Sequence, residues 1–241
     1  MPTPQGCALQ DLVFTANLGI ILEHLKGRHP VVLSNFATVP RVGETEIGVR
    51  FFESMGYQAR VSPFKFEGEA DLKHLYDNVY IGGYGMRSGL QTYAWMEENF
   101  DMHIIKVEEV DEYLYHLDTT VFPITSENTL VCTDLYEDHE VAAIEKHTNV
   151  VDVSPDDCYS GICNSVRLHN TILNSSHIHD LRAGTEDYTL ETAKNSKLEE
   201  LAINMGFEVS YFNLSEYHKA GALLSCLFMH LNRSSYRINL L

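Results

Sequence analysis

The chain has 241 residues, 44% of them hydrophobic, which supplies a core for one large domain or two small ones. Its 34 acidic and 17 basic residues give a formal net charge of −17. That balance argues against nucleic acids and anionic membranes as partners, because both need a basic face, and it suits a small cationic ligand. No apolar run approaches the roughly 18–20 residues that span a bilayer, and the first residues lack the features of a signal peptide, so we expect a soluble cytoplasmic protein.

The cysteines are odd in number and form no CxxC motif. They are Cys7, Cys132, Cys158, Cys163 and Cys226. No partner cysteine or histidine lies at the spacing of a zinc site, so we predict no bound metal. Free thiols in a reducing cytosol are the simplest interpretation of this pattern.

Short apolar runs recur along the chain and predict strands. These runs cover residues 12–22, 30–35, 57–64, 78–83, 102–107, 119–124, 129–133, 149–153, 164–173 and 207–214. Apolar residues at helical spacing predict helices over residues 44–56, 89–100, 138–147 and 192–206. The alternation of strands and helices indicates an α/β protein.

The predicted helices recur at intervals of about 45–60 residues, and a strand follows each of them. A repeat of this size indicates a modular fold of similar supersecondary units. Such units can surround a pseudo-symmetry axis, and their inner loops then converge on one site. No linker-like segment divides the sequence, so we expect a single domain over residues 1–241.

Two early stretches combine acidic or amide side chains with apolar runs. The stretch DLVFTAN contains Asp11 and Asn17, which by themselves suit a turn cap and a strand end. The stretch FKFEGEADL contains Glu67, Glu69 and Asp71. Three carboxylates so close together form either an acidic surface turn or a cluster that orients a histidine or holds a cation.

The stretch YIGGYGMRSG places Arg87 after a glycine-rich turn. Its glycines do not match a nucleotide-binding loop, and they allow the backbone to turn sharply and bring Arg87 inward. An inward guanidinium can hold a carboxylate through two hydrogen bonds. The alternative is an ordinary arginine on the surface.

Two later stretches carry a histidine and a cysteine. In YHLD, His116 and Asp118 are expected on one face of a strand, with Leu117 in the core. A hydrogen-bonded core histidine is the alternative. Cys226 follows a run of small residues and is either a buried, inert cysteine or a nucleophile whose thiol pKa is lowered by a cation, namely His116 or a bound substrate.

Together and in this order, these stretches resemble the guanidine-modifying superfamily with the pentein fold. Its members include arginine deiminases, arginine dihydrolases, dimethylarginine dimethylaminohydrolases and amidinotransferases. The matching motifs are DLVFTAN, PRVGETE, FEGEAD, GMRS, YHLD and KAGALLSC, and the similarity runs from residue 11 to residue 233. The resemblance implies an α/β propeller of repeated ββαβ modules around a pseudo-fivefold axis. Family members usually have a longer segment before the first motif, so it also implies an N-terminally short chain that lacks most of one module.

The resemblance also implies catalytic roles. Cys226 would be the nucleophile, and His116 would be the general acid and base. Glu67 would orient His116. Because FEGEAD is one residue longer than the family motif, Glu69 is a rival for this role.

Further residues would bind the substrate by the same resemblance. They are Asp11, Asn17, Arg41, Asp71, Arg87 and Asp118. Asp118 matches an aspartate with which arginine deiminases bind the guanidinium, so the resemblance favours free arginine as substrate. The asparagine at position 17 resembles the residue found in the dihydrolase branch. Asp11 would contact the amino end of the substrate, and Arg41 and Arg87 would hold its α-carboxylate.

The activity implied is hydrolysis of the guanidino group of arginine or a close relative through a covalent S-amidino intermediate, without metal or cofactor. The product would be citrulline, or ornithine after a second round. An amidinotransferase remains an alternative, as does a catalytically inactive protein that binds guanidinium or serves in assembly. A homo-oligomer is also open.

Overall fold

The computed structural model describes residue 6, residues 8–25, residue 27 and residues 30–236, so the predicted free thiol of Cys7 lies outside the described residues. Four three-stranded sheets follow one another along this part of the chain. In each sheet two antiparallel strands are followed by a helix and then by a third strand that pairs in parallel with the second. The repeated ββαβ modules expected from the sequence are therefore confirmed.

The modules are bounded as follows. The first contains β1 (Gly19–Ile21), β2 (Pro30–Leu33), α1 (Glu44–Ser54) and β3 (Gln58–Val61). The second contains β4 (Leu72–Tyr76), β5 (Val79–Tyr84), α2 (Leu90–Phe100) and β6 (His103–Glu108). The third contains β7 (Val121–Pro123), β8 (Asn128–Val131), α3 (Asp138–Glu145) and β9 (Asn149–Asp152). The fourth contains β10 (Val166–Leu168), β11 (Thr171–Ser175), α5 (Glu186–Asn204) and β12 (Glu208–Phe212).

Short helices connect and extend the modules. The α-helical ones are α4 (Pro155–Tyr159) and α6 (Ser215–His218). The 3-10 helices are η1 (Gln10–Val13), η2 (Thr15–Leu18), η3 (Val39–Arg41), η4 (Gly68–Ala70), η5 (Leu117–Thr119), η6 (Thr133–Leu135), η7 (Ile178–Asp180), η8 (Ser225–Leu227) and η9 (Ser234–Tyr236). Among the described residues, no helix has both the length and the apolar character needed to cross a membrane.

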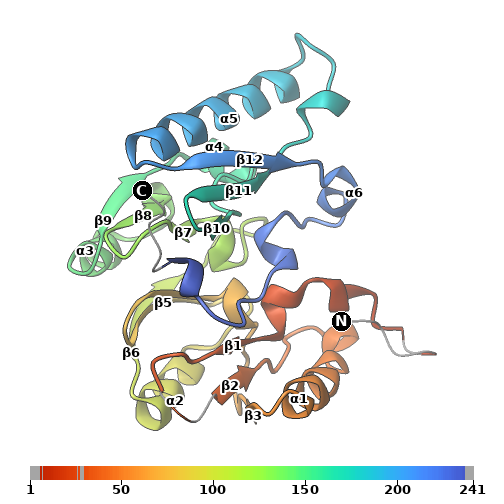
Figure 1. Cartoon of the computed structure of the whole chain (residues 1–241), viewed down its shortest axis with the longest axis vertical. Coiled ribbons are helices and arrows are strands. Elements are labelled where there is room, and N and C mark those ends of the chain that lie inside the picture. The colour runs from red at the N-terminus through yellow and green to blue at the C-terminus, as the bar shows by residue number, and fades with distance from the viewer. Residues whose placement is uncertain (1–5, 7, 26, 28–29, 237–241) are drawn as a thin grey trace.

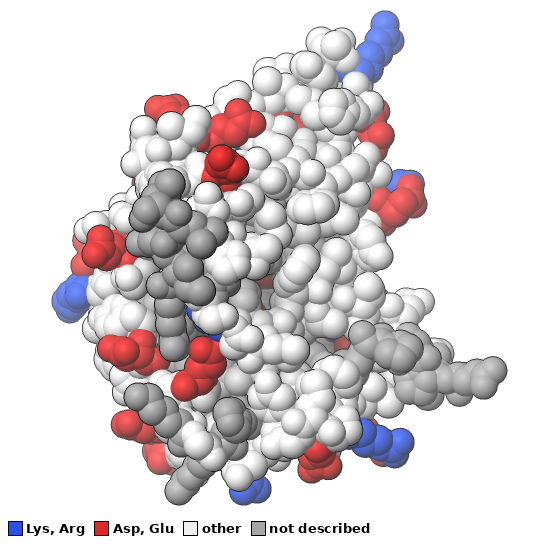
Figure 2. Space-filling view, viewed as in Figure 1, with Lys and Arg blue, Asp and Glu red and all other residues white. Residues whose placement is uncertain are grey.

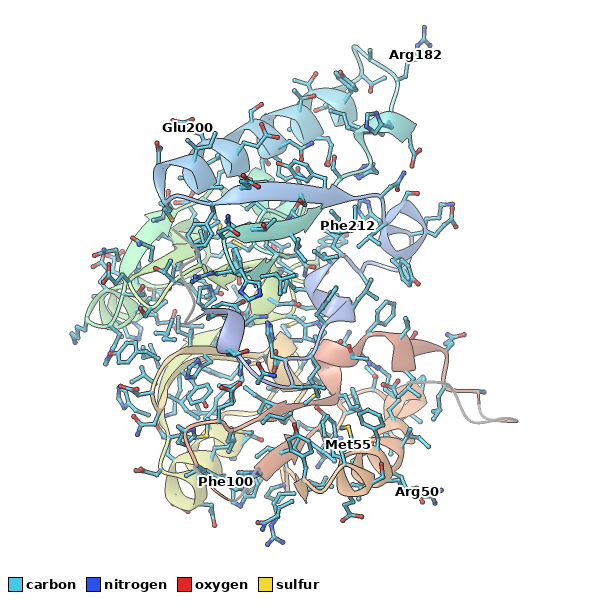
Figure 3. The ribbon with its side chains drawn as sticks, viewed as in Figure 1. Arg50, Met55, Phe100, Arg182, Glu200 and Phe212 are labelled. Atoms are coloured by element: carbon cyan, nitrogen blue, oxygen red, sulfur yellow. The ribbon has the colours of Figure 1, made fainter. Side chains whose placement is uncertain are left out.

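The four sheets form an arc, with α1, α2, α3 and α5 on its outer side (Figure 1). Each long helix has a polar outer face: the labelled Arg50 on α1 and Glu200 on α5 point away from the sheets (Figure 3), and both are exposed. The inner face of α1 buries Phe52, and that of α5 buries Leu198. This amphipathic pattern explains why the spacing of apolar residues in the sequence predicts these helices.

Neighbouring modules share their cores. Ile81 of the second module and Val131 of the third belong to one buried cluster, and Phe122 of the third and Ile172 of the fourth belong to another. Burial of such side chains contributes roughly 1.5–3 kcal/mol each. Packing between modules therefore fixes the modules relative to one another.

Acidic side chains are scattered over the face shown in Figure 2, and basic ones are fewer. They do not gather into a single patch on that face. The net charge of −17 is therefore spread over the surface as well as placed in the interior, where several carboxylates are buried.

The segment after β12 returns to the inner side of the arc, where it is the blue chain in the middle of Figure 1. There it forms hydrogen bonds with residues from, or next to, all four modules. The partners are Thr15 with Leu227, Glu69 with His230, Asp118 with Ser225, and Asn164 with Ser225. This segment carries Cys226, so its path decides where the predicted nucleophile lies.

Most of the predicted elements are confirmed, and three are wrong. Residues 12–22 form two 3-10 helices before the short strand β1, and residues 164–173 form the β10–β11 hairpin, with His169 at φ +55° in its turn. The last long helix begins at Glu186, where the Thr185 side chain accepts a hydrogen bond from the Tyr188 amide. Strand β4 was missed because its alternation is masked by the polar residues Lys73 and His74.

Gly68 opens the turn η4 with φ +66°, and any side chain there would enter the backbone of the first module. An added methyl group would lie 2.7 Å from the Gly19 nitrogen and 2.8 Å from the Asn17 carbonyl carbon. We expect Gly68→Ala to lower the free energy of unfolding by about 3 kcal/mol or more, because the turn must shift in addition to adopting a left-handed backbone. Denaturant unfolding followed by circular dichroism measures this loss.

Gly206→Ala is the matched control, since Gly206 has φ +80° and open space around it. It should lose only about 1–2 kcal/mol, the cost of the left-handed conformation alone. Equal losses in the two variants would show that the contact with the first module is unimportant.

Candidate active site

A cavity of about 280 Å³ lies where the inner loops meet. Six of the predicted site residues line it: Asp11, Asn17, Arg41, Arg87, His116 and Cys226. The sulfur near the end of the chain and the imidazole from its middle therefore share one cavity. Glu67, Asp71 and Asp118 are almost fully buried and lie behind this wall.

His116 precedes the 3-10 turn η5, which corrects the predicted strand over YHLD. The turn still separates the side chains as the sequence predicted, because Leu117 is fully buried in the core. The His116 Nε2 atom lies 2.8 Å from Glu67 Oε2 and 3.2 Å from Asn17 Nδ2. Glu67 also accepts a hydrogen bond of 3.2 Å from the Ala37 amide.

Charge pairing stabilises the ionised forms of His116 and Glu67. Burial raises the pKa of Glu67, but the hydrogen bond and the charge of His116, together with Arg87, outweigh it and lower the pKa overall. Burial lowers the pKa of His116, but the carboxylates of Asp71 and Glu67 outweigh it and raise the pKa overall. Both shifts favour the imidazolium form of His116 and the carboxylate form of Glu67.

Glu69, the rival carboxylate, faces a different partner. Its oxygens lie 2.6 Å from His230 Nδ1 and 3.0 Å from Arg233 Nη2. Burial raises the pKa of Glu69, but the charges of Arg233 and His230 bring it down to about 2. The geometry thus places Glu67 on His116, and Glu69 on the segment that follows Cys226.

Cys226 lies in the turn η8, with its side chain almost fully buried. Burial and the nearby carboxylate of Asp118, whose Oδ2 lies 3.8 Å from the sulfur, raise the pKa of the thiol to about 12. The sequence suggested that His116 would lower this pKa, and the structure shows the opposite in the free protein. Burial and Asp118 are the causes of the raised pKa, and the imidazole of His116 is paired with Glu67.

Asp118 is fully buried and accepts a hydrogen bond from the Ser225 hydroxyl through Oδ2. Its Oδ1 atom is also buried and has no hydrogen-bond partner among the described residues. A buried carboxylate oxygen without a donor is costly. The carboxylate beside the sulfur therefore has capacity for a cationic donor.

Asp71 is expected at the substrate, but the structure places it behind His116 and off the cavity wall. It accepts a hydrogen bond from the Ser88 hydroxyl. Burial raises its pKa to about 7, partly offset by the charge of His116. Its charge supports the imidazolium form of His116, and its Oδ1 atom, like that of Asp118, is buried without a hydrogen-bond partner among the described residues.

The two predicted arginines differ in their partners. Arg41 is buried, and its guanidinium binds Glu44 through two hydrogen bonds of 2.9 and 2.8 Å. It also donates to the carbonyl groups of Asp11 and Phe14, so it holds the loop that carries Asp11.

Arg87 is the more available arginine. Its side chain is 25% exposed and its guanidinium lies 4.5 Å from the centre of the Tyr115 ring. Glu67 Oε1 is 3.8 Å away, at the limit of an ion pair. Its place on the cavity wall suits a carboxylate ligand.

Two contributors were missed in the sequence. Tyr115 lies against Arg87, and Asn164 Nδ2 lies 3.4 Å from the sulfur of Cys226. Tyr115 is the first residue of the YHLD motif, so its place beside His116 is evident from the sequence. Asn164 lies 62 residues from Cys226 in a stretch taken for a strand, and no local signal marks it.

Comparison with known proteins supports the resemblance, although no family model matches the chain. The chain is 26% identical over 235 residues, 95% of its length, to the bifunctional arginine dihydrolase/ornithine cyclodeaminase AgrE of a Nostoc strain. It is 27% identical over 227 residues, 92% of its length, to the bifunctional arginine dihydrolase/ornithine cyclodeaminase ArgZ of a Synechocystis strain. The chain spans about 30% of the first relative and 29% of the second.

Solved structures show the same fold. The crystal structure of the ArgZ N-terminal domain with a covalently bound reaction intermediate superposes with a TM-score of 0.78 at 26% identity, over 92% of this chain and 76% of that one. A dimethylarginine dimethylaminohydrolase superposes with a TM-score of 0.64 at 16% identity, which supports the fold alone. The chain has the pentein fold and resembles the guanidine-modifying superfamily, as the motifs predict.

The ion pair between Glu67 and His116 makes a pH-dependent contribution to stability. The raised pKa of His116 contributes stability that is complete below its ordinary value of 6.5 and is lost as the pH rises through the folded pKa. The lowered pKa of Glu67 contributes stability above its ordinary value of 4.5 and is lost as the pH falls. We expect Glu67→Gln to cost most between these two values, by about 3 kcal/mol, in denaturant unfolding across pH.

Glu69→Gln provides the matched control. In nuclear magnetic resonance titrations, Glu67→Gln should lower the pKa of His116, whereas Glu69→Gln should leave it near the wild-type value. A His116 that responds to Glu69 and not to Glu67 would overturn the assignment of its partner.

Proposed function

We propose that this chain hydrolyses the guanidino group of arginine or a close relative, with Cys226 as nucleophile. The observation that carries the proposal is the placing of Cys226 and His116 on one cavity, with the buried Asp118 carboxylate 3.8 Å from the sulfur. A guanidinium is planar and carries donors that match a carboxylate in two-point hydrogen bonding. Asp118 is therefore the first anchor for the reacting end of the substrate.

The remaining cavity residues suit the other parts of an amino acid. Arg87 is the candidate for the α-carboxylate and Asp11 for the α-amino group, because both lie on the cavity wall. In this proposal Arg41 mainly stabilises the loop that carries Asp11, since its guanidinium is already hydrogen-bonded to Glu44. Asn17, in contact with His116, lies at the reacting end.

The electrostatics of the free protein suit a reaction that begins only when a cation binds. The pKa of Cys226 is about 12, so the thiol is neutral until the substrate cation offsets the charge of Asp118, and the thiol then releases its proton to solvent. The thiolate then attacks the guanidino carbon, and positioning by Asp118 removes much of the entropic cost. The imidazolium of His116, held by Glu67, donates a proton to the departing ammonia.

The second half of the reaction uses the neutral imidazole that the first half produces. His116 removes a proton from a water molecule, which attacks the S-linked amidino carbon. The carbon–sulfur bond breaks and citrulline is released. A second round on the same carbon would yield ornithine, ammonia and carbon dioxide, and the similarity to arginine dihydrolases supports this outcome.

A cytoplasmic location and a homo-oligomer remain predictions. The four described cysteines are unpaired, which supports a reducing compartment. Sedimentation or light scattering of the purified protein would establish the oligomeric state.

Incubation with arginine tests the proposal. We expect ammonia together with citrulline or ornithine, and we expect Cys226→Ser to abolish all three because the nucleophile is lost. Mass spectrometry after exposure to a haloacetamidine should map the label to Cys226. The ratio of ammonia to amino acid product counts the rounds of hydrolysis.

Other outcomes would select the alternatives. Product that appears only when an amine acceptor is added would indicate an amidinotransferase. Binding of arginine without any product or adduct would leave a binding protein. Full activity in Cys226→Ser would refute the proposed nucleophile.

Asp118→Asn should separate the two effects of this carboxylate. Loss of the charged partner should raise KM for arginine by about 10- to 100-fold. The same change should lower the pKa of Cys226, because Asp118 raises it in the wild type, and so should speed alkylation of Cys226 by a neutral reagent. Steady-state kinetics and alkylation rates measure the two effects, and a variant that alkylates more slowly would contradict this role.

A further inference from the structure

Asn164 lies beside the reacting sulfur on a different chain segment from the predicted motifs. Its side chain is 1% exposed, in the loop between α4 and β10. The amide nitrogen Nδ2 lies 3.4 Å from the sulfur of Cys226. This distance is within the range of an N–H donor to sulfur.

The orientation of the Asn164 amide is fixed by its other end. The backbone N–H of Ser225 donates a hydrogen bond of 2.8 Å to Oδ1. Because only the carbonyl oxygen can accept this bond, the orientation of the amide is set, and Nδ2 lies nearer the sulfur, at 3.4 Å, than Oδ1 does, at 3.9 Å. One side chain therefore fixes the backbone before Cys226 and presents a donor to its sulfur.

The loop that carries Asn164 is itself held in place. The backbone N–H of Asn164 donates to the Gly161 carbonyl, and the Ser165 hydroxyl donates to the Ile162 carbonyl. Asn174 donates from the neighbouring strand β11 to the Gly161 carbonyl and to the Ser165 hydroxyl. The donor is thus in place before any substrate arrives, as effective electrostatic stabilisation requires.

The sulfur needs such a donor because its surroundings oppose the charged form. Burial and Asp118 raise the thiol pKa, while hydrogen bonds from the Leu223 backbone and the Asn164 side chain lower it. Hydrogen bonds to a charged group are stronger than those to a neutral one. A donor at this position stabilises the thiolate more than the thiol.

We propose that Asn164 is a further catalytic residue of the reaction proposed above, on which this inference rests, and that its amide stabilises the thiolate of Cys226. When the thiol loses its proton to solvent, the electron pair left on sulfur accepts the N–H of Asn164. The pair then forms the bond to the guanidino carbon. When water hydrolyses the intermediate, the carbon–sulfur bond breaks, the pair returns to sulfur, and the same N–H stabilises it again.

Alkylation of Cys226 by iodoacetamide tests the proposal without arginine. Rates are measured between about pH 8 and pH 11 on the full chain, and the labelled peptide is identified by mass spectrometry. We expect Asn164→Ala to slow labelling of Cys226 at a given pH by about tenfold and to move its profile to higher pH, because a hydrogen bond to a charged group is lost.

Asn164→Asp separates chemistry from structure. The aspartate keeps the oxygen that accepts the Ser225 N–H, and it replaces the donor with a carboxylate oxygen next to the sulfur. If Asn164 acts on the thiolate, this variant should label still more slowly than Asn164→Ala. Labelling at or above the wild-type rate would overturn the proposal, because the lost donor and the added carboxylate should both oppose the thiolate.

Asn174→Ala is the matched control, because Asn174 is fully buried and supports the same loop without touching the sulfur. We expect its labelling profile to keep the wild-type pH dependence. A shift as large as that of Asn164→Ala would assign the effect to the loop and overturn the proposal. Circular dichroism and thermal unfolding of each variant confirm that it is folded.

Turnover of arginine distinguishes this inference from the proposed function. In an active wild type, we expect Asn164→Ala to lower kcat by about tenfold or more with little change in KM, since it touches the sulfur. An unchanged kcat would overturn the catalytic role while leaving the proposed function intact. A wild type without turnover would refute the proposed function and with it the catalytic role, and labelling would still show whether Asn164 tunes the thiol.

Discussion

The candidate site depends on one turn, residues 67–71, and on the two buried carboxylates that it carries. Glu67 holds His116, which comes from the loop between the second and third modules, and Glu69 holds His230 and Arg233, which follow the cysteine. Removing one partner from a buried ion pair leaves a charge without compensation, which is costly. The two pairs therefore fix the imidazole and the cysteine segment relative to the same short piece of backbone.

Gly68 completes this arrangement because it brings the turn against the backbone at Asn17. Three segments that are far apart in the chain thus meet at a single place. The sheets behind them supply rigidity, since neighbouring modules share buried clusters. A site built on loops gains precision when rigid elements hold the ends of those loops.

The electrostatics assign opposite resting states to the two reacting groups. Asp71 and Glu67 outweigh the burial of His116 and raise its pKa, which favours the imidazolium, whereas burial and Asp118 raise the pKa of Cys226 to about 12 and oppose the thiolate. In the proposed reaction, a cationic substrate would supply the charge that favours the thiolate of Cys226, and His116 would supply the proton for the leaving group. A neutral thiol is less nucleophilic than a thiolate, so the buried sulfur is protected from unwanted reactions when no cation is bound.

The sequence by itself determined the α/β class, the repeat and most strand and helix positions, and its motifs predicted that Cys226 and His116 share one cavity. These follow from periodicity and from motifs in which the informative residues are neighbours. It did not determine which of Glu67 and Glu69 faces His116, nor the place of Asp71 or the contact of Asn164 with the sulfur. The contacts of Glu67, Asn164 and Glu69 join residues that are 49 to 161 positions apart in the chain. Only packing in three dimensions decides which of these side chains meet. The raised pKa of the Cys226 thiol also depends on the tertiary structure, because burial is a property of the fold and not of the residue.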